Sequence, residues 1–146
     1  MPSWLKLLLA LAVTGFVGIT LVVGGVVWWV RNNKDRLLED ARTAATEGKA
    51  FGAKHTRGEC IDDTVARAEQ CRPMDLVCVT GARLRLNACA SVATDDGACR
   101  DVPGRGEVIK VALWANRECE RRGKAGSQAC QNVMQGVVEV CEMAKP

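Results

Sequence analysis

The chain has no tyrosine, only two phenylalanines and a single histidine, His55, and no two of its cysteines form a CxxC motif. Zinc ribbons, thioredoxin-type redox pairs and c-type haem attachment sites therefore lack their signature. There is no glycine-rich phosphate loop, and His55 has no Ser and Asp set around it. The basic residues are scattered and lack neighbouring aromatics, which argues against nucleic-acid binding. We therefore predict no enzyme activity, no cofactor, no metal site and no nucleic-acid partner.

Cysteine is the residue that the chain does have in quantity. Eight cysteines occur at regular spacing among 146 residues, and a short chain with an even number of them is typical of a disulfide framework. Such a framework requires an oxidising compartment. The net charge of +3 is close to balance and identifies no partner.

The clearest pattern lies between Cys60 and Cys89. Ten residues separate Cys60 from Cys71, six separate Cys71 from Cys78, and ten separate Cys78 from Cys89. Eleven positions along an α-helix return to nearly the same face. Two antiparallel helices folded about the centre of this symmetric pattern bring Cys60 to Cys89 and Cys71 to Cys78. The spacing therefore predicts a helical hairpin pinned at both ends.

This spacing resembles the helical hairpins of twin-CX9C mitochondrial proteins and plant α-hairpinins. The resemblance covers residues 60–89, where each arm has ten residues between its cysteines in place of nine. It implies a hairpin arrangement and carries no function with it.

A second helical pair is predicted nearer the carboxyl end. Gly123 is expected to end its first helix and Ser127 to cap its second. Cys119 then meets Cys130, and the preceding loop folds back so that Cys99 reaches Cys141. The expected inward stripes are Val108, Val111, Ala112, Ala115 and Cys119, followed by Cys130, Val133, Met134, Val137, Val138 and Cys141.

The amino-terminal part contains an uncharged run over residues 7–30, which exceeds the ~20 apolar residues that cross a bilayer. Tryptophans flank it at both ends, as is typical of membrane interfaces. We favour a retained anchor over a cleaved signal peptide, whose apolar core is shorter. Small residues recur along one face, where another membrane helix can approach closely: Ala10, Thr14, Gly18 and Gly25.

These patterns predict an all-α protein with a single N-terminal transmembrane helix, followed by a small disulfide-stapled domain of two antiparallel helical hairpins. The expected boundaries are 1–30 for the anchor, 31–58 for a juxtamembrane helix and linker, and 59–146 for the hairpin domain. A helix is expected to continue over residues 31–47, and Gly48, Gly52 and Gly58 are expected to break it into a flexible linker.

Two rules conflict on orientation. Positive charges after the span outnumber those before it, which favours a cytoplasmic carboxyl-terminal side. The cysteine framework favours the opposite side, and we give it more weight because folded domains translocate despite flanking charge. A single-pass membrane protein with a periplasmic or other extracytoplasmic domain is therefore expected.

The leading functional hypothesis is a non-enzymatic accessory subunit of a membrane protein complex, in contact with the lipid bilayer and with other membrane subunits. The alternative is a membrane-tethered binding module for an exported protein or peptide. A thiol–disulfide enzyme is a third class, and it requires a reactive cysteine. A partner surface is expected at Ile109, Leu113 and Trp114 unless these side chains pack against the first hairpin.

Overall fold

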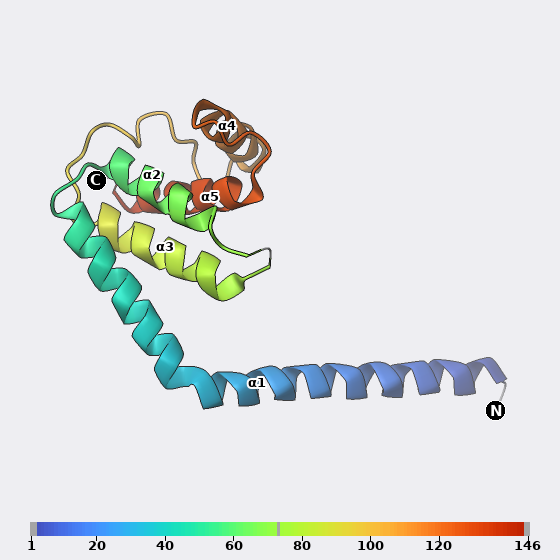
Figure 1. The fold of residues 1–146 in the computed structure, drawn as a ribbon. Coiled ribbons are helices and arrows are strands. Elements are labelled where there is room, and N and C mark those ends of the chain that lie inside the picture. Colours follow the sequence, from blue (N-terminus) through green and yellow to red (C-terminus); the bar gives the residue numbers. More distant parts are fainter. Residues whose placement is uncertain (1–2, 73, 145–146) are drawn as a thin grey trace. The chain divides into compact units, whose positions relative to one another are not determined.

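The computed structural model describes the backbone of residues 3–72 and 74–144; within the first helix it describes the side chain of residue 4 and those from residue 13 onward. The described part contains five helices (Figure 1): α1 Ser3–Gly52, α2 Arg57–Ala68, α3 Leu76–Ala90, α4 Val108–Arg121 and α5 Gln128–Met143. It contains no strand, only an isolated bridge between Thr56 and Thr94. The prediction of an all-α protein is confirmed.

Helix α1 continues through residues 31–47, as expected, and ends at Gly52. From Val13 onward it is long and apolar enough to cross a membrane, judged by length and composition. The chain divides into two compact units, Met1–Glu39 and Asp40–Pro146. The last turns of α1 therefore belong to the unit that carries all eight cysteines.

Side-chain caps set the starts of three helices. Thr56 accepts from the backbone N–H of Glu59 and Glu59 accepts from that of Thr56, a reciprocal capping box at α2. Asp75 caps α3 by accepting from the N–H of Cys78. Ser127 caps α5 by accepting from the N–H of Cys130, as the sequence predicts.

The end of α4 is a Schellman motif. Gly123 adopts a φ of 68°, which disfavours residues with a Cβ. Its N–H donates to the carbonyl of Glu120, and the N–H of Lys124 donates to that of Cys119. The predicted helix end at Gly123 is confirmed.

Residues 40–146 share one core, because α5 contacts α2, α3 and α4. Most buried side chains are small, and the core contains only a few bulky ones. Leu86 and Met134 are its largest fully buried side chains, and Trp114 is 7% exposed. The two helical pairs, α2 with α3 and α4 with α5, are therefore not independent of one another.

The buried face of α4 differs from the predicted stripe. Val108 is 74% exposed and Ala112 is also exposed, whereas Trp114, Ala115 and Cys119 are buried. Turning α4 toward Trp114 removes far more apolar surface from water than burying Val108 would. The helix is therefore rotated relative to the stripe read from the sequence.

The expected glycine-rich break after residue 47 is wrong. Gly48 and Gly52 lie inside α1, where both are buried against the backbone of α3. A Cβ at Gly48 would lie 2.5 Å from the carbonyl oxygen of Arg85, and one at Gly52 would lie 2.2 Å from that of Cys89. These glycines permit close approach of two helices rather than flexibility.

We predict that Gly48→Ala lowers the free energy of unfolding by about 1–3 kcal/mol, because the added methyl group forces two backbones apart. Gly81→Ala in α3 is the matched control. No atom lies within 4 Å of its Cβ position, so it should stabilise the helix by up to about 1 kcal/mol. Urea unfolding of the full chain in detergent, followed by circular dichroism, measures both. A Gly48→Ala midpoint at or above that of the parent contradicts the prediction.

Candidate functional site

Four disulfides join the eight cysteines, and no cysteine is free. They are Cys60–Cys89, Cys71–Cys78, Cys99–Cys141 and Cys119–Cys130. The Cα atoms of the pairs are 5.4 to 5.9 Å apart, within the usual range for a bridge. These are the four pairs expected from the spacing.

Two of the bridges share one local design. Cys71 lies just beyond the end of α2 and Cys119 lies near the end of α4, and each is bridged to the third residue of the next helix. That third residue is Cys78 in α3 and Cys130 in α5, and its N–H is held by the helix cap. The helix cap therefore fixes the backbone of the second cysteine of each bridge.

The loop between α3 and α4 carries Cys99 back to the end of α5. Its turn is fixed by two carboxylates: Asp95 accepts from the N–H of Gly97, and Asp96 accepts from those of Ala98 and Gly58. Gly97 has a φ of 82°, which favours glycine. Residues 95–97 therefore form a tight turn before Cys99.

Hydrogen bonds lower the pKa of the Asp96 carboxyl. Burial pushes this pKa upward, but the Thr56 hydroxyl and the N–H groups of Ala98 and Gly58 favour the charged form and outweigh it. The carboxylate therefore stays ionised while it holds the loop to the start of α2.

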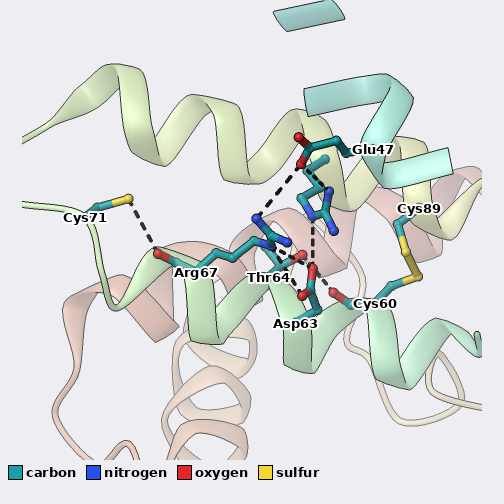
Figure 2. A network of polar contacts seen from close by, with 8 residues as sticks. Glu47, Cys60, Asp63, Thr64, Arg67, Cys71 and Cys89 are labelled. Carbon is teal, nitrogen blue, oxygen red and sulfur yellow. Dashed lines mark hydrogen bonds and ion pairs between the residues drawn. A yellow bond between two sulfur atoms is a disulfide. The ribbon is translucent and has the colours of Figure 1, made fainter. Parts of the chain in front are cut away.

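A polar cluster around Arg85 is the most distinctive site in the domain (Figure 2). The Arg85 side chain is only 7% exposed. Its Nε donates to Asp63 of α2 at 2.9 Å, and its Nη1 donates to Glu47 of α1 at 3.0 Å. Arg67 donates to the same Asp63 carboxylate at 3.1 Å. Two arginines and two carboxylates therefore join α1, α2 and α3 in a neutral network.

Phe51 completes the surroundings of this cluster. The Arg85 guanidinium lies 5.7 Å from the centre of the Phe51 ring, and that ring stacks on His55 at 3.8 Å. His55 Nδ1 also lies 2.8 Å from the Phe51 carbonyl oxygen. Phe51 in the last turn of α1 thus lies beside the buried arginine, and His55, stacked on Phe51, is half-buried.

Arg122 forms a second connection between helices. It donates to Asp62 of α2 at 2.7 Å and to Glu118 of its own helix at 2.7 Å. Burial lowers its pKa, but the hydrogen bonds and charges of Glu118 and Asp62 outweigh burial, so the pKa is raised. The positive charge that holds α2 to the end of α4 is therefore permanent.

Sequence reasoning missed the Arg85 cluster. The available signal was an arginine flanked by Ala82, Leu86 and Cys89 on the face of α3 expected to be buried. An arginine on an apolar face needs a carboxylate nearby because an unpaired buried charge is costly. Its partners lie 22 and 38 residues away, so no local pattern reveals them.

The predicted packing face of the span lies on α1. The side chain of Ala10 falls outside the described side chains, and Thr14 is exposed. At Gly18 and Gly25 no atom lies within 4 Å of the Cβ position. The same holds at Gly15 and Gly24, so this part of α1 is open all round and the small-residue face stays a prediction.

Only part of the predicted partner surface is exposed. Ile109 is 77% and Leu113 is 58% exposed. Trp114 is buried, so its inclusion in that surface is wrong. It packs into the core because it is the largest apolar side chain on α4.

Comparisons with protein-family models, curated proteins and solved structures find no match. Within the described residues, no group of three or more His, Cys, Asp or Glu side chains is placed to hold a metal ion. The Arg85 cluster, the disulfides and the exposed apolar positions are therefore the observations from which function is argued.

We predict that Arg85→Met lowers the free energy of unfolding by about 2–3 kcal/mol, because it leaves the Asp63 carboxylate without its buried partner. Arg117→Met, at an exposed position of α4, is the matched control and should change stability by less than about 0.5 kcal/mol. Urea unfolding in detergent measures both variants. Equal losses for the two would show that the cluster does not stabilise the domain.

Proposed function

We propose that the chain is a non-enzymatic, single-span accessory subunit of a membrane protein complex. In this proposal α1 crosses the bilayer, and the disulfide-rich domain, read as two antiparallel helical hairpins, lies on the extracytoplasmic side. The span contacts another membrane subunit through its small-residue face. The domain presents a fixed surface to the same complex.

The observation that carries the proposal is the attachment of α1 to the domain. Its last turns pack on α3 through Gly48 and Gly52, and Glu47 is paired with Arg85. A tether that only keeps a domain near the membrane has no need of such contacts. They make the end of α1 part of the domain surface that a complex would contact.

The small residues of the span support a helix partner. Gly18 and Gly25 leave the α1 backbone open at positions on one side of the helix. In a bilayer, close backbone approach of this kind drives helix association through van der Waals contact. The proposed partner is therefore a second transmembrane helix.

The disulfides support an extracytoplasmic domain. Thiols are kept reduced in the cytosol, and a domain with a core of small side chains would lose much of its stability there. Against this stand Arg31, Lys34, Arg36 and Arg42, which follow the span. We give the disulfides more weight because all eight cysteines are engaged.

For the sidedness we predict that protein taken from its native membrane is fully oxidised. Non-reducing peptide mapping, with free thiols blocked at lysis, should recover peptides linked through the four bridges. Recovery of eight free thiols would place the domain in the cytoplasm and restore the positive-charge rule as the better guide.

For the span we predict that Gly18→Leu abolishes or weakens association by at least about tenfold, because the larger side chain separates the helices. Gly24→Leu, which lies about 120° away from Gly18 around α1, is the matched control and should leave association intact. Purification in mild detergent followed by native mass spectrometry measures the bound mass. A lone monomer at every concentration of the parent chain would overturn the proposal.

A membrane-tethered binding module is the second candidate, favoured by exposed apolar side chains on the domain itself. Ile109 and Leu113 on α4, and Leu76 and Val77 on α3, are all exposed. Deleting residues 1–30 separates the candidates. A binding module keeps its partner as a soluble domain, whereas a subunit assembled through its span loses it.

A further inference from the structure

The four disulfides differ in how closely their sulfur atoms are enclosed. Cys60, Cys89, Cys119, Cys130 and Cys141 are each at most 2% exposed. Cys71 and Cys78 are both half-buried, and theirs is the one bridge in which neither cysteine is buried. Cys60–Cys89 and Cys119–Cys130 are therefore shielded from reagents in solution, whereas Cys71–Cys78 is not.

A groove of about 180 Å³ opens beside this bridge. Both cysteines line it, together with Arg67, Arg85 and Glu47. Arg67 is about half exposed and its charge is paired with Asp63 at 3.1 Å, so the groove is close to neutral toward an approaching thiolate. Glu47 opposes that approach, but its carboxylate is already paired with Arg85 at 3.0 Å.

The segment that the bridge closes holds a costly backbone conformation. Met74 has a φ of 66°, in the left-handed region that residues other than glycine disfavour, and its side chain is 96% exposed. The Met74 side chain packs on little, and the segment is held by the Cys71–Cys78 bridge together with the hydrogen bond from the Asp75 N–H to the Arg72 carbonyl oxygen. Opening the bridge would release the backbone at Met74.

We propose that Cys71–Cys78 is a redox-responsive bridge that a dithiol reduces selectively in the folded protein. The dithiol thiolate attacks Cys71 Sγ, the S–S bond breaks, and Cys78 leaves as a thiolate in the first turn of α3, where the helix dipole favours negative charge. The second thiol of the reagent then releases Cys71. The protein gains two electrons and two protons, and the dithiol becomes a disulfide.

The reduced thiol of Cys71 has an acceptor in place. Its Sγ lies 3.9 Å from the Arg67 carbonyl oxygen (Figure 2). While the bridge is closed, this sulfur carries no hydrogen and cannot donate a hydrogen bond. Once reduced, the thiol can donate to this oxygen. Reduction therefore frees the segment around Met74 while Cys60–Cys89 still joins α2 to α3.

The test is differential alkylation of the full-length protein in detergent. Dithiothreitol is added at a series of concentrations, and exposed thiols are trapped at successive times with light N-ethylmaleimide. The protein is then unfolded, fully reduced and labelled with the heavy reagent, and peptides are read by mass spectrometry. Cys119–Cys130 is the internal control, because it also joins the end of one helix to the third residue of the next but is buried.

We expect Cys71 and Cys78 to be trapped at least about tenfold faster than Cys119 and Cys130, since the buried pair must wait for unfolding. Circular dichroism should show the helical content retained at that stage. Equal rates for the two pairs, labelling of Cys71 and Cys78 only in denaturant, or loss of helix with their reduction would each overturn the proposal.

The variant Cys71→Ser/Cys78→Ser provides a second check. At the concentration of dithiothreitol that opens this bridge in the parent, the variant should yield no alkylated cysteine. Labelling of its other cysteines at that concentration would show that the core bridges are equally reducible. The outcome is independent of whether the span binds another subunit.

Discussion

The fold depends on bridges that join the ends of helices. The core of residues 40–146 is built mainly from alanine, valine and cysteine, so burial of apolar surface contributes less per residue than in a core of leucine and phenylalanine. Small domains of this kind need covalent staples, and each bridge contributes roughly 2–4 kcal/mol in the chain-entropy account. The helix caps at Asp75 and Ser127 act together with the staples, because they hold the backbone of Cys78 and Cys130 where the bridges form.

The Arg85 cluster serves a different purpose from the bridges. A buried arginine and its two carboxylate partners together add little net stability compared with well-packed apolar residues that replace all three, since their desolvation offsets the attraction; removing the arginine alone is costly because it leaves a carboxylate unpaired. It is, however, specific: Arg85 satisfies Asp63 and Glu47 only when α1, α2 and α3 are all in place. Disulfides hold α2 to α3, and none of them involves α1. Close packing at Gly48 and Gly52 and the pairing of Glu47 are the contacts that hold α1.

The features that could be predicted from the sequence are those with a regular residue spacing or a local sequence motif. Cysteines eleven positions apart predict bridges between facing helices, Ser127 and Gly123 mark a helix start and a helix end, and an uncharged run marks the long apolar helix. Features that depend on distant partners could not be predicted in this way. From the sequence alone, Gly48 is equally compatible with a helix break and with a close helix contact; only its packing against α3 distinguishes them. Val108 fits the apolar stripe of α4, but burial of Trp114 rotates the helix and leaves Val108 exposed. The partners of Arg85 are 22 and 38 residues away, so no local pattern identifies them.

Small residues four positions apart occur near both ends of α1. In the domain, Gly48 and Gly52 lie four residues apart on one face, and the backbone of α3 fills the space that a Cβ would occupy at each of them. In the apolar part of α1, Thr14 and Gly18 have the same spacing, and Gly25 lies on the same side of the helix; at Gly18 and Gly25, as at Gly15 and Gly24, that space is open. Glycine in the interior of a helix costs about 0.5–1 kcal/mol relative to alanine, so a face of small residues is expected where a close contact compensates for that cost. For Gly48 and Gly52, this close contact is the packing against the backbone of α3. By the same physical reasoning, the open positions of the span support the proposal that a second membrane helix packs there.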